Sequence, residues 1–112
     1  MQIRIEQQAH VTVVAVTGSI DALTAEALTS ALHEQVLSGN THLVASFHEV
    51  EYTSSAGLRV LLATLKEARQ HGGDLRLASV QERVRGVLEL SGFTSILKLY
   101  PDVEQAVASY PA

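Results

Sequence analysis

The sequence predicts an α/β fold in which four helices pack on a mixed sheet of four or five strands. Segments with the pattern of strands alternate with segments of helical periodicity from residue 11 onward. Apolar residues make up 46% of the 112 residues, enough for one core, but aromatic residues make up only 4%. A core of Leu, Val, Ile and Ala suits helices packed on a sheet better than an aromatic-rich β-sandwich. Right-handed crossovers would make the second, third and fourth strands parallel and leave the first strand antiparallel.

Periodicity and stop signals place each element along the chain. "MQIRIEQQ" alternates Ile3 and Ile5 with polar residues, as a half-buried strand does, and His10 falls in a short turn. "VTVVAVTG" is β-branched and almost continuous, which predicts a strand covered on both faces and paired with the first. Strands are expected at residues 1–8, 11–18, 42–50, 74–80 and 95–100, and helices at residues 22–38, 55–71, 81–92 and 102–110.

The best-defined helix follows the third strand. Its inward face is expected to carry Leu58, Leu61, Leu62, Leu65 and Ala68, with charged residues on the other faces and glycines at its end. The helix before it is expected to begin at Ala22, after Asp21 as N-cap, because a carboxylate can accept from the free amides of a first turn. Thr24 is a weaker cap candidate.

Charge and composition exclude several classes of protein. The net charge is −4 and the eight Lys and Arg residues are scattered, so no nucleic-acid surface is expected. The chain has no cysteine, which removes disulfides, thiolate nucleophiles and zinc–thiolate sites. It has no apolar run long enough to cross a membrane and no signal-peptide pattern, so we expect a cytoplasmic protein with no membrane contact, no cofactor and no metal.

Two adjacent serines stand where the third strand meets the second helix, in "EYTSSAGLRVLL". Ser54 or Ser55 could cap the helix, and the two need not share one role. A hydrolase nucleophile is disfavoured, because a nucleophile elbow needs a glycine on both sides of the serine and no histidine has a spacing that predicts a triad. Phosphorylation of a serine here has a physical basis. A phosphate at a helix N-terminus faces unpaired amides, so the fold can accommodate it. The same phosphate adds charge to the surface on which a partner would dock.

A second strand-to-helix junction, residues 18–24, could lie beside the first. Ligands gather at the carboxyl ends of strands in open α/β sheets. If the two strands are neighbours, Asp21 and Ser55 share one rim of the sheet. Gly57 lowers helix propensity in the first turn, which indicates a close approach of other backbone or of a partner.

The stretches "VTGSIDALTAEAL", "YTSSAGLRVLL", "GGDLRLASV" and "VLELSGFTSILKLYPDVEQAV" resemble, in order and spacing, the STAS domain of free-standing bacterial anti-sigma factor antagonists. The resemblance covers essentially the whole chain and implies a single STAS domain over residues 1–112. It implies that the protein is not an enzyme. It also implies that the unphosphorylated form binds an anti-sigma factor that is itself a GHKL-type serine kinase. Phosphorylation would end that binding, and a metal-dependent serine phosphatase would restore it.

The resemblance also assigns roles to residues, with some departures. Aligned on Gly57 and Leu58, the phosphorylated serine is Ser55, with Ser54 in the position of the family's aspartate and Ala56 in that of its second hydroxyl. Asp21 matches the family's upstream acid, with Ser19 in place of its glutamate. The expected partner-binding residues are Asp21, Thr24, Ser54, Ser55, Ala56, Gly57 and Arg59.

Three functional hypotheses remain open at this point. The first is the anti-sigma factor antagonist, a monomer or weak dimer switched at Ser55, with Ser54 as the less favoured site of modification. The second is a STAS module that binds a small ligand or nucleotide through Asp21 and Ser55, as a sensor or scaffold. The third, a hydrolase with Ser55 as nucleophile, predicts labelling by a serine-directed reagent.

Overall fold

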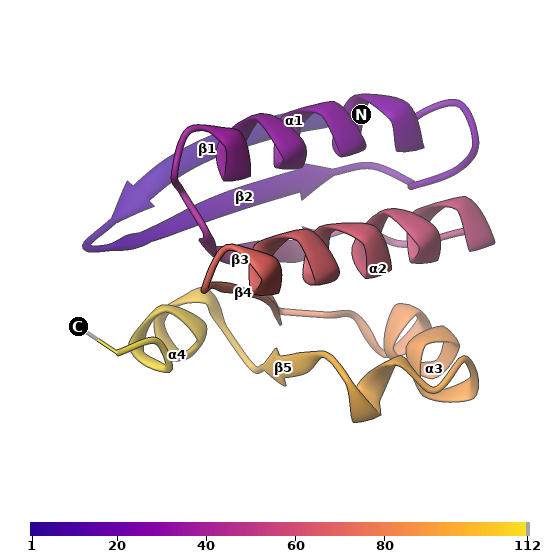
Figure 1. The fold of residues 1–112 in the computed structure, drawn as a ribbon. Helices are drawn as coiled ribbons and strands as arrows, with labels where there is room; N and C mark the ends of the chain where they lie inside the picture. Colours follow the sequence, from indigo (N-terminus) through magenta and orange to yellow (C-terminus); the bar gives the residue numbers. More distant parts are fainter. Residues whose placement is uncertain (112) are drawn as a thin grey trace.

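The computed structural model describes residues 1–111 and contains a five-stranded mixed sheet (Figure 1). The spatial order follows the chain, β1-β2-β3-β4-β5; β1 is antiparallel to β2 and every later neighbour is parallel, which confirms the predicted fold class. Ala112, the last residue of the expected domain, lies outside the described residues. The strands are β1 (Gln2–Gln8), β2 (Val11–Thr17), β3 (His42–Glu49), β4 (Asp74–Ala78) and β5 (Lys98–Tyr100).

Four α-helices and one short 3-10 helix connect and cover the strands. Figure 1 shows the two longest helices side by side along the sheet. The helices are α1 (Ala25–Leu37), α2 (Ser55–Gln70), α3 (Glu82–Leu90), the 3-10 helix η1 (Phe93–Ser95) and α4 (Val103–Ala108). The expected strand at 95–100 is shorter than predicted, because Ser95 belongs to η1 and Ile96 and Leu97 form a turn and a bend before β5 begins at Lys98.

The sheet carries a separate apolar cluster on each face. Alternate residues of a strand point to opposite faces, so Val14 and Val16 of β2 join the core beneath α1, α2 and α3. Val11 and Val13 of the same strand pack with Ala106 of α4. The helices therefore cover both faces, three on one and one on the other, and β2 is buried on both sides as predicted.

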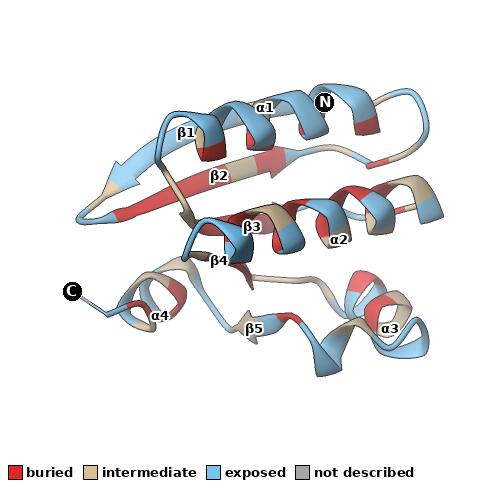
Figure 2. Ribbon diagram, viewed as in Figure 1, coloured by how far each residue is buried: buried red, intermediate tan, exposed pale blue. Residues whose placement is uncertain are grey.

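The inward faces of the helices are the buried ones, as Figure 2 shows for α1 and α2. The predicted inward stripe of α2 is partly wrong. Leu58 and Leu62 are only half-buried, whereas Val60 and Thr64 are buried. The stripe is rotated toward Val60 because α2 packs against both the sheet and α1. In α3 likewise, Val84 and Leu88 are buried and Val87 is half-buried.

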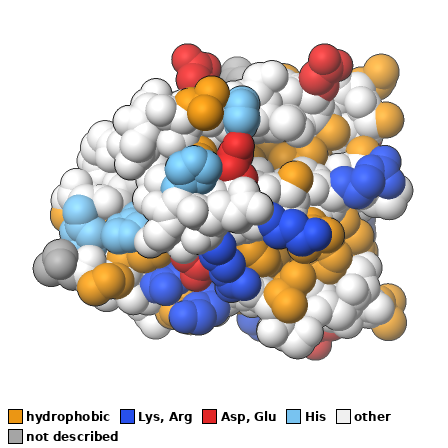
Figure 3. Space-filling model, viewed as in Figure 1, with side chains coloured by type: hydrophobic (Ala, Val, Ile, Leu, Met, Phe, Trp, Pro, Cys, Tyr) orange, Lys and Arg blue, Asp and Glu red, His pale blue; other side chains and the backbone are white. Residues whose placement is uncertain are grey.

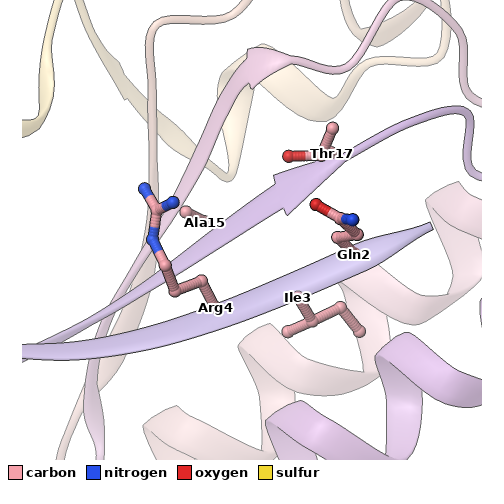
Figure 4. A pocket seen from close by; sticks show the side chains of 5 residues that line it. All are labelled: Gln2, Ile3, Arg4, Ala15 and Thr17. Atoms are coloured by element: carbon pink, nitrogen blue, oxygen red, sulfur yellow. The ribbon is translucent and has the colours of Figure 1, made fainter.

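The edge strand β1 is less buried than its alternating sequence suggests. Ile3 is half-buried against the main core, but Ile5 remains 41% exposed. Figure 4 shows that Ile3 points toward the helices, while Gln2 and Arg4 point to the other face of the sheet. The alternation therefore identifies the strand correctly but overstates the burial of its apolar face.

Candidate functional site

The loops that follow β2 and β3 are joined to each other by backbone hydrogen bonds. An isolated parallel bridge links Ile20 to Thr53. The Ile20 N–H donates to the Tyr52 carbonyl at 2.9 Å, and the Ser54 N–H donates to the Ile20 carbonyl at 2.8 Å. The two junctions therefore share one rim of the sheet, as predicted, and each is held against the other by the main chain.

Gly57 allows α2 to approach this pair of loops closely. A Cβ atom at position 57 would lie 2.1 Å from Thr53 Oγ1 and 2.8 Å from Ile20 Cγ2, closer than such atoms can come. The expected close approach is thus an approach of the chain to itself. Gly57 is buried, so it sets the position of the serine junction and offers no surface to a partner.

The two serines differ in their hydrogen bonds and exposure. Ser54 is the N-cap of α2: its backbone is extended, with φ −90° and ψ 177°, and its Oγ accepts from the Ala56 N–H at 3.2 Å. Ser55 is the first residue of the helix and is exposed. One serine therefore satisfies the helix terminus, while the hydroxyl of the next stands at the surface.

Asp21 and Thr24 form a reciprocal cap one turn before α1. Asp21 Oδ1 accepts from the N–H groups of Leu23 and Thr24, at 2.9 and 3.1 Å, and the Asp21 N–H donates to Thr24 Oγ1 at 2.9 Å. Asp21 was predicted to be the N-cap of the helix, but it closes a turn over residues 22–24; the regular helix begins only at Ala25, with Thr24 as its N-cap residue. Thr24 therefore occupies the N-cap position, but its Oγ1 accepts from the Asp21 N–H and makes no cap hydrogen bond to α1.

A shallow hollow of about 390 Å³ lies between the first turns of α1 and α2, next to this rim. Small side chains line most of it, and Glu26 and Arg59 contribute its charged groups. Its lining comprises Ala22, Ala25, Glu26, Thr29, Ala56, Arg59, Val60 and Ala63. Two of the predicted partner-binding residues, Ala56 and Arg59, therefore lie in one concave surface beside Ser55.

Two large exposed side chains flank the site and are absent from the predicted set. Leu23 is 92% exposed in the turn closed by Asp21, and Tyr52 is 50% exposed in the loop before Ser54. Figure 3 shows hydrophobic and Lys/Arg side chains reaching the surface together at the right-hand end, where α1 and α2 begin. The sequence does not reveal either residue, because Leu23 lies at the start of a range expected to be helical and Tyr52 lies in a connecting segment without periodicity.

The contacts around Ser55 do not resemble those of a hydrolase. Four of the five histidines have partners elsewhere: His33 Nδ1 lies 2.6 Å from Glu67 Oε2, His71 Nδ1 lies 2.9 Å from the Glu67 carbonyl, and the ring of His42 contacts those of His10 and Tyr110. Within residues 1–111, no hydrogen bond joins a histidine to Ser55, and no group of three or more His, Asp or Glu side chains could hold a metal ion.

The electrostatic surroundings of Ser55 favour an added negative charge. The first turn of α2 contains no acidic residue, and the positive end of the helix dipole points to the serine hydroxyl. Arg59 is exposed four residues later, on the same side of the helix. The carboxylate of Asp21, on the neighbouring loop, is already engaged by the amides of its own turn.

Residues 2–106 match the family model described as the STAS domain. The chain belongs to this family. A relative from Bordetella bronchiseptica named as an anti-sigma factor antagonist, BtrV, is 39% identical over 93 residues, which cover 83% of this chain and 80% of BtrV. The Mycobacterium tuberculosis anti-sigma-F factor antagonist RsfB is 32% identical over 99 residues, covering 87% of this chain and 79% of RsfB.

A solved structure agrees with the fold of this STAS domain. The crystal structure of an anti-sigma factor antagonist from Mycobacterium paratuberculosis superposes with a TM-score of 0.88 at 30% identity, covering 96% of this chain and 92% of that one. Over residues 1–111, none of the helices is both long and apolar enough to span a membrane.

Proposed function

We propose that this STAS domain is an anti-sigma factor antagonist of a partner-switching pathway, controlled by reversible phosphorylation of Ser55. The observation that carries the proposal is the division between the two serines. Ser54 caps α2 through its Oγ, so the exposed hydroxyl of Ser55 can be modified without loss of the cap. The names of the relatives support the antagonist role.

The unphosphorylated form binds an anti-sigma factor that is also a GHKL-type serine kinase. Its docking surface is the rim around Ser55: the Asp21 turn with exposed Leu23, the loop with Tyr52, and the hollow between α1 and α2. Leu23 and Tyr52 are the apolar contacts of this surface, and Arg59 and Glu26 supply its charges. A few exposed apolar and arginine side chains commonly provide most of the binding energy of such interfaces.

The kinase transfers the γ-phosphoryl group of ATP to Ser55 Oγ, and the hydroxyl proton passes to a base of the kinase as ADP leaves. The phosphate carries about −1.5 to −2 charges. The N-terminus of α2 accommodates this charge, because the positive end of the helix dipole lies there. The phosphate projects from the middle of the docking surface, so its size and negative charge disrupt the contact and the kinase dissociates. A metal-dependent phosphatase hydrolyses the ester and returns the serine.

The first experiment uses paired baits in an extract of the source bacterium. Immobilised Ser55→Ala and Ser55→Asp variants differ only at the proposed switch. We expect the Ser55→Ala bait to retain a GHKL-type kinase, identified by mass spectrometry, and the Ser55→Asp bait to release it. Equal retention of that kinase by both baits would show that Ser55 does not control the interaction.

The second experiment identifies the modified atom. The captured kinase and ATP are incubated with the wild type, Ser54→Ala and Ser55→Ala, and intact mass and peptide mapping follow. One phosphate is expected on the wild type and on Ser54→Ala, and none on Ser55→Ala. A phosphate that persists in Ser55→Ala would overturn the assignment.

A nucleotide titration separates this proposal from a ligand-binding STAS module. We expect no heat of binding when ATP, ADP or GTP is titrated into the free protein. Binding in the absence of a partner protein, lost in Asp21→Ala and Ser55→Ala, would favour the ligand-binding function instead.

A further inference from the structure

The outer edge of β1 is a long and largely uncovered strand edge. The sheet order places β1 at one end, paired only with β2, and five of its seven residues are exposed. Edge strands present unpaired N–H and C=O groups, which readily bind another strand. The opposite edge, β5, has only three residues, so β1 is the better edge for pairing.

The sequence of β1 is complementary to itself in one antiparallel register. When Ile5 of one copy faces Ile5 of another, Arg4 faces Glu6 of the second copy, and Glu6 faces its Arg4. Arg4 and Glu6 are two residues apart, so their side chains lie on the same face of the strand. Figure 4 shows Arg4 on the face of the sheet opposite to α1 and α2, where the opposing side chain would also lie.

The neighbouring registers place like charges opposite each other. A shift of two residues in one direction brings Arg4 opposite Arg4, and a shift in the other direction brings Glu6 opposite Glu6. Opposite charges that face each other across strands stabilise the pairing, and like charges destabilise it. The charges therefore select one register and also disfavour its alternatives.

We propose that two copies of this chain associate through antiparallel pairing of their β1 strands. The two sheets then form one continuous sheet, related by a two-fold axis that passes between the two Ile5 residues. The contact is self-complementary, as such an axis requires. It closes after two copies, because each copy offers one β1 edge.

The pairing leaves the Ser55 site free. The loops that carry the site follow β2 and β3, whereas the second copy lies on the far side of β1. The association is weak, because one strand pair buries little surface, and it weakens further with salt, because its charges are exposed. The dimer is therefore expected only at high protein concentration.

Single cysteines test the register directly, since the chain has no cysteine of its own. In Ile5→Cys, the two facing Cα atoms would lie about 4.5–5.5 Å apart, within the range of a disulfide. In Gln7→Cys, the matched control on the same face, the two cysteines would be offset by four residues, or about 14 Å. Mild oxidation should cross-link Ile5→Cys and not Gln7→Cys. Equal yields for the two variants, or no cross-linking of Ile5→Cys, would overturn the proposal.

Charge exchange supplies the second test, by sedimentation equilibrium over a range of concentrations. Arg4→Glu and Glu6→Arg should each raise the dimer dissociation constant roughly fivefold or more, because each substitution creates two facing pairs of like charge across the interface. The double variant Arg4→Glu/Glu6→Arg should restore it. Arg83→Glu, the same charge change on the exposed surface of α3, is the control and should have no effect.

Circular dichroism confirms that each variant is folded before it is compared. A wild type that stays monomeric at the highest concentration, or a double variant as weak as the single ones, would contradict β1 pairing in this register.

Discussion

At the scale of single residues, Ser54 and Ser55 have different roles at the N-terminus of α2: Ser54 caps the helix, and Ser55 is exposed. The Ser54 hydroxyl is held by an amide of the first turn, and Ser55 directs its hydroxyl outward. A phosphate on Ser54 would break the cap that starts α2. A phosphate on Ser55 leaves the cap in place, which is the physical reason to assign the switch to the second serine.

Alanine substitutions should distinguish the two serines by stability alone. Ser54→Ala removes the N-cap and should lower the free energy of unfolding by about 0.5–2 kcal/mol. Ser55→Ala removes an exposed hydroxyl and should change it by less than about 0.5 kcal/mol. Urea denaturation of both variants measures the difference. A larger loss in Ser55→Ala than in Ser54→Ala would mean that the capping roles are reversed.

Gly57 and Gly86 form a matched pair for a second stability test. Both are helical, but a Cβ at Gly57 would collide with Thr53 and Ile20, whereas a Cβ at Gly86 has nothing within 4 Å. Gly57→Ala should destabilise the protein by about 1–3 kcal/mol through overpacking. Gly86→Ala should stabilise it by about 0.5–1 kcal/mol through helix propensity. Thermal and denaturant unfolding check both signs, and a stabilised Gly57→Ala would contradict the close packing of the two loops.

At the scale of elements, the aromatic residue that follows α4 helps to attach this helix to the sheet. Tyr110 Oη lies 2.7 Å from the Leu43 carbonyl and 2.8 Å from the Asp74 carbonyl, so its hydroxyl spans the start of β3 and β4. Its ring stacks on His42, with centroids 4.8 Å apart, and the Arg76 guanidinium lies 3.9 Å from the ring centroid. The short helix α4 thus gains a fixed position from contacts beyond its own six residues.

The environment of Tyr110 predicts a loss of stability in alkaline solution. Burial, and to a smaller extent the Asp74 carboxylate, raise the pKa of Tyr110 well above its usual value. Above a pH of about 10 the unfolded chain releases this proton while the folded chain keeps it, so the free energy of unfolding falls as pH rises. Tyr110→Phe should show a smaller fall between pH 9.5 and 11 than the wild type, measured by urea denaturation. Parallel pH profiles for the two proteins would contradict this role.

The same substitution tests the docking of α4 at neutral pH. Tyr110→Phe leaves the packing of the ring but removes the buried hydroxyl, which should cost about 1–2 kcal/mol. Tyr100→Phe, on the half-buried strand β5, is the control and should cost less. Chemical denaturation at pH 7 measures both changes.

At the scale of the whole molecule, the proposed switch should alter the surface and leave the fold unchanged. Ser55→Asp adds charge at the positive end of α2, where it should change the free energy of unfolding by less than about 1 kcal/mol. Hydrogen exchange should show unchanged protection in β2, β3 and β4. Broad loss of protection in those strands would mean that modification acts by unfolding the domain instead of blocking a surface.

Most of the fold could be predicted from the sequence, because its strands and helices carry distinct periodicities. The continuous β-branched run of β2 predicted a strand buried on both faces, and the glycines after α2 marked its end. The burial of β1 was overstated, because the pattern of Ile3 and Ile5 does not reveal that the strand lies at an edge. The start of α1 was placed three residues early, because an N-cap residue looks the same before a turn as before a helix.

The candidate site was predictable in outline and not in detail. Adjacent strand-to-helix junctions placed Asp21 and Ser55 on one rim, and the bridge between Ile20 and Thr53 joins the two loops. The choice between Ser54 and Ser55 as cap needed the backbone geometry. The exposure of Leu23 and Tyr52 depends on how the two loops turn, which no local pattern reveals.

The bridge between Ile20 and Thr53 also sets how fast such a switch can respond. Main-chain hydrogen bonds and the close packing at Gly57 hold both loops, so we expect the proposed switch at Ser55 to act without rearrangement of these loops. For the proposed switch, the delay between modification of Ser55 and release of the partner is then expected to equal the residence time of that partner. Substitutions at the rim can lengthen or shorten that delay without altering the core beneath it.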